Sequence, residues 1–127
     1  MAEHKKKILV IDDSQSSRYL YKAVLSNTGD FVTFLCPNLA EGLKIFKEIN
    51  PDLIVLDMDL PDGSGMDFLK EIRSQGSQSK VIVISAIKAS DVIIQSAKLG
   101  IGTYLIKPVD INLFVKKVKE FLELAVP

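Results

Sequence analysis

Several side chains that could take part in chemistry come directly after short apolar runs of the sequence. They are, in chain order, Asp12, Asp13, Asp57, Asp59, Ser85 and Lys107. Each of them alone has an ordinary explanation, because loops are polar and because Asp13 or Ser14 could simply cap a following helix. Together they place acids, a hydroxyl and an amine at the ends of several apolar runs. This joint pattern indicates a functional site.

The acids suggest a particular chemistry. Carboxylates that lie close together repel one another, so a cluster of them favours a bound cation. The chain has one cysteine, Cys36, and one histidine, His4, which argues against a zinc site and for the oxygen ligands that Mg²⁺ prefers. Mg²⁺ commonly binds phosphate through one or two carboxylates, and a carboxylate can itself form an aspartyl phosphate. An ammonium group would neutralise charge on the transferring phosphoryl oxygens. The predicted chemistry is phosphoryl transfer to a carboxylate.

The elements that must position these residues can be read from hydrophobic patterns. Continuous, β-branched apolar runs predict parallel strands that are buried on both faces. Such runs cover residues 8–11, 53–56, 81–84 and 104–106, with a weaker strand at 31–35. Helical periodicity predicts helices at 14–26, 38–49, 65–73, 90–99 and 110–124. Asn38 and Asp110 are the expected N-caps, and Gly100 is the expected stop after the fourth helix.

Strand and helix alternate five times along the chain. This alternation predicts an α/β fold, an open parallel sheet with helices on both faces. Ligands of such sheets bind at the carboxyl ends of the strands, which is where the polar residues above are expected to lie. The 127 residues are predicted to form a single domain, 1–127, with no effector domain after it.

Composition excludes several classes of protein. Lys+Arg and Asp+Glu both number 16, so a net charge of zero provides no electrostatic footprint for nucleic acid or an anionic membrane. No apolar run approaches the length of a membrane-spanning helix. The single Cys36 cannot form an internal disulfide, which fits a buried apolar role and a cytoplasmic location.

The chain resembles the CheY-like receiver domains of bacterial two-component response regulators over essentially its whole length. The matching motifs are Ile-Asp-Asp-Ser at 11–14, Leu-Asp-Met-Asp-Leu-Pro at 56–61 followed by Gly65, Ser-Ala at 85–86, Gly-Ile-Gly-Thr-Tyr at 100–104 and Lys-Pro at 107–108. The resemblance implies a flavodoxin-like, doubly wound sheet of five strands in the order 2-1-3-4-5 with five helices. It also implies a phosphorylation-activated switch in a phosphorelay.

The resemblance further implies a role for each acid. Asp57 is the expected phosphoacceptor, and it receives its phosphoryl group from a phosphohistidine on a sensor histidine kinase or phosphotransfer protein. Asp12, Asp13 and Asp57 are expected to hold Mg²⁺, with the backbone carbonyl of Asp59 as a further ligand.

Three other residues receive roles from the same resemblance. Ser85 is expected to donate its hydroxyl to a phosphoryl oxygen and to move on activation, and the Tyr104 ring is expected to change rotamer with it. Lys107 is expected to pair with the phosphate. Its peptide bond to Pro108 is expected to be cis, an isomer that only a following proline makes accessible.

Two positions bear on the lifetime of the phosphoryl group. Hydrolysis needs an oriented water, and Ile87 offers no polar group to orient one. Asp59 works in the opposite direction, because its carboxylate could hold a water near the site. We therefore predict a comparatively long-lived aspartyl phosphate.

The predicted output surface includes the helix at 90–99. Val92, Ile93 and Ile94 are consecutive, so they cannot all face the core. With Ile94 and Ala97 on the core face, Val92 or Ile93 would lie at its edge, where together with Tyr104 it would form a partner surface. The residues at 102–103 lack an acidic pair typical of dimerising relatives. The expectation is a monomer or weak dimer that engages a downstream protein target or a fused effector domain.

Two alternatives remain open at this point. Residues 53–59 also resemble the nucleophile motif of haloacid-dehalogenase-type phosphatases, although that family places it on the first strand of a longer chain. A non-catalytic, receiver-like interaction module is the second alternative. Such a module would usually lose part of the acid, hydroxyl and amine set that this chain keeps. The resemblance implies a chain that catalyses its own phosphorylation and dephosphorylation but is chiefly a signalling switch, since a receiver labels itself rather than turning over a substrate.

Overall fold

A computed structural model describes residues 5–122, which contain a five-stranded parallel sheet. The sheet order is β2-β1-β3-β6-β7, which is the predicted order 2-1-3-4-5 once an additional hairpin, β4 and β5, is numbered. The strands are β1 (Lys6–Ile11), β2 (Phe31–Cys36), β3 (Leu53–Asp57), β6 (Lys80–Ser85) and β7 (Thr103–Ile106). All five lie where apolar runs predicted them, with ends one or two residues longer in several cases.

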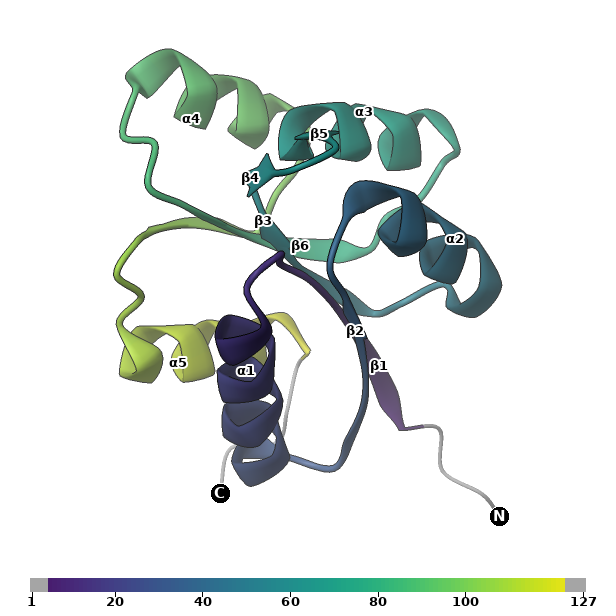
Figure 1. The fold of residues 1–127 in the computed structure, drawn as a ribbon, viewed down its shortest axis with the longest axis vertical. Coiled ribbons are helices and arrows are strands. Elements are labelled where there is room, and N and C mark those ends of the chain that lie inside the picture. The colour runs from purple at the N-terminus through teal and green to yellow at the C-terminus, as the bar shows by residue number, and fades with distance from the viewer. Residues whose placement is uncertain (1–4, 123–127) are drawn as a thin grey trace.

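Helices cover both faces of the sheet (Figure 1). One face carries α1 (Gln15–Thr28) and α5 (Ile111–Phe121). The other carries α2 (Leu39–Ile49), α3 (Gly65–Ser74) and α4 (Ser90–Lys98). The doubly wound α/β architecture predicted from the alternation of strands and helices is confirmed.

The core is divided into two layers by the sheet itself. Within β1, Ile8 and Val10 belong to the layer beneath α1 and α5, whereas Leu9 and Ile11 belong to the layer beneath α2, α3 and α4. All four are fully buried. A strand with apolar neighbours on both faces has no solvent side, which is why its sequence is continuously apolar rather than alternating.

Side chains cap α1, α2 and α5 at the positions that the sequence indicated. Asn38 accepts a hydrogen bond from Glu41 N at the start of α2, and Asp110 accepts one from Leu113 N at the start of α5. Ser14 caps α1, so the ordinary explanation for this residue is correct. His4 and the predicted helix end at Leu124 lie outside the described residues. Within 5–122, none of the helices has both the length and the apolarity that a membrane crossing requires.

The orientation of α4 differs from the prediction. Ile94 is 54% exposed and Ala97 is also exposed, so the expectation that they face the core is wrong. Val92 is half-buried and packs against the core instead, and Ser96 is fully buried one turn later. The Ser96 hydroxyl donates to the Val92 carbonyl at 2.9 Å, which lets a polar residue occupy the core face without an unpaired group.

The hairpin between β3 and α3 was not predicted from the sequence. It consists of β4 (Asp59–Leu60) and β5 (Gly63–Ser64), paired antiparallel with Asp59 opposite Ser64. Strands of two residues carry no periodic signal, which explains why hydrophobic patterns do not reveal them.

Candidate functional site

Three carboxylates meet at the carboxyl ends of β1 and β3. Asp57 is the last residue of β3, and Asp12 follows directly after β1, which pairs with β3 in parallel. One carboxylate oxygen from each of Asp12, Asp13 and Asp57 lies within 4.8 Å of the others. Asp12 and Asp57 are each only 3% exposed, whereas Asp13 is exposed at the rim. The parallel pairing of β1 with β3 therefore brings together the three acids that were predicted to form a cluster.

Lys107, which directly follows the edge strand β7, completes the group. Its Nζ lies 3.1 Å from Oδ2 of Asp57, across 50 residues of sequence. The backbone N–H of Asp59 donates to Oδ1 of Asp57 at 3.0 Å, so both oxygens of this carboxylate have a partner. The Lys107–Pro108 peptide bond is cis, as predicted. The contacts from the Lys107 ammonium and from the Asp59 N–H together fix the orientation of the Asp57 carboxylate.

The electrostatics of the site reflect its burial. Burial raises the pKa of Asp12, opposed by a hydrogen bond from the Ser14 N–H and reinforced by the negative charge of Asp57. For Lys107, burial by itself would lower the pKa, but the hydrogen bond and charge of Asp57 raise the pKa overall. The site therefore combines acids that repel one another with a single ammonium that neutralises part of their charge.

The two predicted switch residues both bind backbone groups of the same residue, Ile87. Ser85, fully buried at the end of β6, accepts a hydrogen bond of 3.0 Å from the N–H of Ile87. The Tyr104 hydroxyl donates to the Ile87 carbonyl at 2.8 Å. Ile87 is thus held from both sides in the loop that leads from β6 to α4.

Three further residues, to which the sequence assigned no role, also support the site. The Arg18 guanidinium donates to the backbone carbonyl of Asp12 at 2.7 Å. Tyr21 is buried beneath the acids, and its burial together with their charges raises its pKa to about 12. At Gly65, a Cβ atom would lie 3.1 Å from the backbone oxygen of Asp57, so only glycine fits here without displacing the strand end. The motif match already included Gly65 without explaining it, but no local signal singles out Arg18 or Tyr21.

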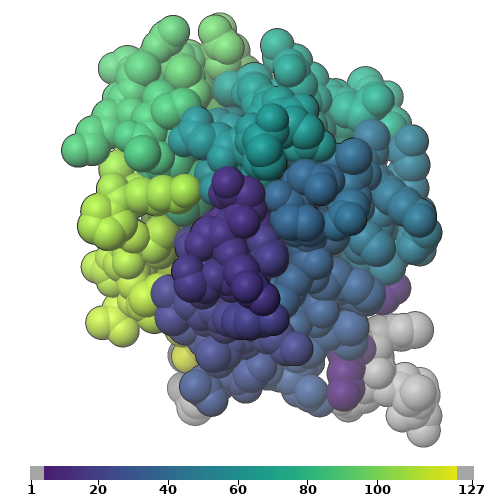
Figure 2. Space-filling view, viewed as in Figure 1, coloured from purple at the N-terminus to yellow at the C-terminus, as the bar shows by residue number. Residues whose placement is uncertain are grey.

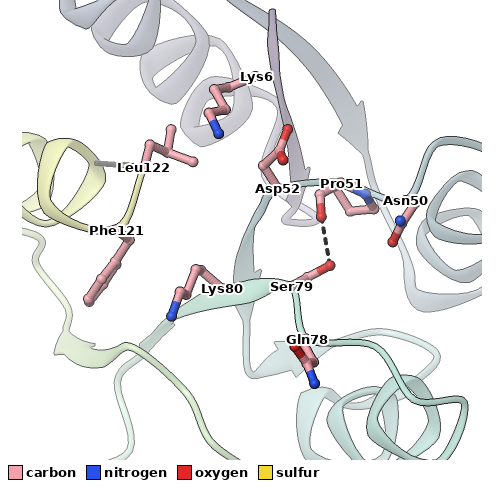
Figure 3. Close-up of a pocket in the computed structure, with 9 residues that line it drawn as sticks. All are labelled: Lys6, Asn50, Pro51, Asp52, Gln78, Ser79, Lys80, Phe121 and Leu122. Carbon is pink, nitrogen blue, oxygen red and sulfur yellow. Dashed lines mark hydrogen bonds between the residues drawn. The ribbon is translucent and has the colours of Figure 1, made fainter. Parts of the chain in front are cut away.

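A cleft beside the acids is lined by Asp13, Met58, Asp59, Leu60, Pro61, Gly63, Ser64 and Ile87. In the space-filling view, the purple segment at the start of α1 lies against the teal segment that carries the hairpin (Figure 2). A separate cavity, lined by Lys6, Asp52, Ser79, Lys80 and five other residues, lies at the opposite end of the strands and contains none of the clustered acids (Figure 3).

The residues at the carboxyl edge fit a hard divalent cation. Carboxylate oxygens are the ligands such an ion prefers, and the repulsion among three nearby carboxylates is relieved by positive charge. Asp57 is the one acid of the cluster that also contacts an ammonium, and it lies beside the open cleft. This arrangement can present a carboxylate to a phosphoryl group while neutralising the charge that accumulates.

Comparison with known proteins agrees with this geometry. The family model described as the response regulator receiver domain matches residues 8–119. Among curated proteins, sporulation initiation phosphotransferase F of Bacillus subtilis is 35% identical, over 93% of this chain and 94% of that protein. The chemotaxis protein CheY of Thermotoga maritima is 30% identical, over 81% of this chain and 86% of that protein.

Solved structures show the same fold. A CheY-like response regulator receiver domain protein from Methanospirillum hungatei superimposes with a TM-score of 0.88 at 25% identity, covering 94% of this chain and 95% of that one. A receiver domain protein from Clostridium thermocellum has a TM-score of 0.85 at 32% identity, covering 93% of this chain and 94% of that one.

Proposed function

Because this chain belongs to the response regulator receiver domain family, and so acts as a phosphorylation-activated signalling switch, we propose that Asp57 is its phosphoacceptor. One observation carries this assignment. Asp57 is the acid that shares a cluster with Asp12 and Asp13 and also contacts the ammonium of Lys107 at 3.1 Å. Asp12 and Asp13, with Asp57 itself and the Asp59 carbonyl, are the proposed ligands of Mg²⁺.

In the proposed reaction, an oxygen of Asp57 attacks the phosphorus of a phosphohistidine on a histidine kinase or phosphotransfer protein. The oxygen–phosphorus bond forms as the phosphorus–nitrogen bond breaks, and the ring nitrogen keeps the electron pair and takes up a proton. When bound, Mg²⁺ neutralises charge on the phosphoryl oxygens. Lys107 transfers its contact from the Asp57 carboxylate to the new phosphoryl group, since its Nζ is already beside the attacking side chain.

The proposed switch is a shift between two populations of conformers. The phosphoryl group attracts the Ser85 hydroxyl, which moves inward, and Tyr104 fills the space that is left. Both residues bind Ile87, so a movement of Ser85 changes the contacts of the whole loop that precedes α4. The backbone of Ile87 thereby links the site to the outer surface.

The partner surface is proposed on α4 and β7. Ile94, rather than Val92 or Ile93, supplies the exposed apolar side chain of α4, and Tyr104 lies half-buried on β7. We propose that a downstream protein or fused effector reads this face, and that the chain is cytoplasmic and is a monomer or weak dimer. Size measurements with and without beryllofluoride test the oligomeric state, and a tight activated dimer would contradict it.

Incubation with acetyl phosphate and Mg²⁺, followed by intact mass measurement, tests the proposed phosphoacceptor. We expect the mass to rise by one phosphoryl group per chain and the Asp57→Asn variant to remain unlabelled, because an amide is not a nucleophile. Continuous release of phosphate from a phosphate ester would favour the phosphatase alternative. An unchanged mass, with no spectral response to beryllofluoride, would favour the non-catalytic module.

A further inference from the structure

The tip of the β4–β5 hairpin carries an acid that reaches to a different helix. Oδ1 of Asp62 accepts a hydrogen bond of 2.9 Å from the backbone N–H of Leu39, and Oδ2 accepts one of 3.0 Å from Ala40. Leu39 and Ala40 are the first two residues of α2, whose N–H groups have no acceptor within their own helix. One carboxylate, more than twenty residues further along the chain, therefore satisfies both groups.

A second contact ties the same hairpin to the same helix. Gly63 has φ of 146°, and a Cβ atom at this position would lie 3.1 Å from Cδ1 of Leu39. The turn thus packs against the first residue of α2 as well as bonding to it. Because Asn38 caps Glu41 N, the hairpin and the regular N-cap together satisfy three N–H groups at this helix end.

The other end of the hairpin is joined to the phosphoacceptor. The Asp59 N–H donates to Oδ1 of Asp57 at 3.0 Å, and the Gly65 N–H donates to the Met58 carbonyl at 3.0 Å. An isolated two-stranded hairpin is marginally stable in water, and this one has two residues in each strand. Its position therefore depends on what its tip is attached to. Charge-assisted hydrogen bonds to a helix N-terminus form a strong attachment.

We propose that Asp62 is a positioning residue for the phosphoryl-accepting site, which clamps the β4–β5 hairpin to α2 and so holds Asp59 beside Asp57. This inference rests on the proposed function, because Asp59 supplies a proposed metal ligand through its carbonyl. By linkage, metal binding then strengthens the contact between Asp62 and α2 to the same degree as the contact strengthens metal binding. The N-terminus of α2 is thereby coupled to the occupancy of the site.

The test compares Asp62→Ala with Asp67→Ala. Asp67 lines the same groove between α2 and α3, is also exposed, and carries the same charge, but it is outside the hairpin. We expect Asp62→Ala to weaken Mg²⁺ binding, measured by calorimetry, about fivefold to tenfold, the lower end of the usual range for couplings between linked sites. Asp67→Ala should stay within about twofold, the electrostatic effect of one exposed charge.

Hydrogen exchange supplies a readout that does not depend on the metal. In metal-free protein, the amides of Leu39, Ala40 and Leu60 should exchange faster in Asp62→Ala and at wild-type rates in Asp67→Ala. Asp62→Asn, which retains one acceptor oxygen, should fall between Asp62→Ala and the wild type. Urea unfolding of each variant confirms that the fold is intact.

Two results would overturn the inference. One is equal loss of Mg²⁺ affinity in both alanine variants, which would assign the effect to net charge alone. The other is unchanged exchange of Leu60 in folded Asp62→Ala, which would show that the hairpin does not need the clamp. A wild-type chain that fails to bind Mg²⁺ would contradict the proposed function instead, and the exchange of Leu60 in metal-free protein would still decide whether Asp62 holds the hairpin.

Discussion

The two ends of the strands in the central sheet, called here the carboxyl edge and the amino edge, carry similar kinds of polar residues. These residues find different kinds of partners at the two ends. At the carboxyl edge, Asp12, Asp13 and Asp57 face one another, and one ammonium, from Lys107, lies among them. At the amino edge, around the cavity of Figure 3, polar side chains bind backbone groups instead. Asp52 accepts from Lys7 N, and the Ser79 hydroxyl donates to the Pro51 carbonyl at 2.6 Å.

Arg73 shows the amino-edge arrangement most fully. Its guanidinium donates to four backbone carbonyls, those of Ser77, Ser79, Leu99 and Gly100. These bonds join the end of α3 to the loop before β6 and to the end of α4. The side chains of Asp52, Arg73 and Ser79 are therefore satisfied by the folded chain itself.

The difference teaches which edge is built for a ligand. Side chains that form hydrogen bonds to the backbone need no further partner once the protein has folded. Carboxylates held close together, in contrast, repel one another until a cation binds. Substitutions at the amino edge should therefore change stability, and those at the carboxyl edge should change binding and switching.

The largest expected effect is at Asp12. Asp12→Asn keeps an oxygen that can accept from Ser14 N but removes the charge, so Mg²⁺ affinity should fall at least about tenfold, since loss of even an outer-shell partner costs that much. Titration calorimetry measures this loss. An affinity that changes less than twofold would remove Asp12 from the metal site.

The same variant gives a test of pH dependence. Burial raises the pKa of Asp12 in the folded protein above its unfolded value of 3.8. The folded state thus keeps this proton to higher pH, and raising the pH from 3.8 through the folded pKa should destabilise the metal-free wild type relative to Asp12→Asn. Urea unfolding with a chelator, across this pH range, measures the difference. Stability curves that run parallel at all pH values would contradict it.

At the amino edge, Arg73→Ala should lower the free energy of unfolding by about 2–3 kcal/mol, because four backbone carbonyls, three of them in part-buried hydrogen bonds, lose a charged donor. Mg²⁺ affinity should stay unchanged. Lys98→Ala is the matched control, since Lys98 lines the same cavity as Arg73 and is exposed, and it should change stability by less than about 0.5 kcal/mol. Equal effects of the two substitutions would show that the four carbonyl contacts contribute little.

Lys107→Ala separates switching from metal binding. The lysine acts mainly on the phosphate, so the equilibrium between the two conformers of the phosphorylated protein should move back about tenfold or more, the scale of one hydrogen bond to a charged group, and the spectral change on phosphorylation should shrink accordingly. Mg²⁺ affinity should change far less, because the three carboxylates remain. The opposite pattern, a collapsed metal affinity with an intact switch, would show that the role assigned to Lys107 is wrong.

The smallest expected effect concerns the lifetime of the phosphoryl group. Ile87 and Asp59 line the cleft beside the acids, so Ile87→Gln should orient a water and speed decay by roughly tenfold or less. Loss of label from phosphorylated protein, followed by mass, gives the rate. A rate that is unaffected by Ile87→Gln and by Asp59→Asn would leave the lifetime prediction without a basis.

Much of the fold follows from local patterns of sequence. The buried strands were predicted because continuous apolar runs leave no solvent face, and α2 and α5 were placed by Asn38 and Asp110 as caps. The phase of α4 was predicted wrongly because its core face was assigned from apolar residues alone, whereas Ser96, whose hydroxyl is satisfied within the helix, takes a core position. The exposed residue is therefore Ile94, which a count of apolar residues assigns to the interior.

The sequence by itself determined the fold class and the acid, hydroxyl and amine residues at the strand ends, since both depend on neighbours a few positions apart. Only the tertiary structure decided that Lys107 meets Asp57, that Arg73 joins three segments and that Asp62 caps α2. These contacts link residues between about 20 and 50 positions apart, and they form because β1, β3, β6 and β7 pair in one register. Periodicity reports which face of an element is apolar, but packing alone selects the partner that a polar side chain reaches.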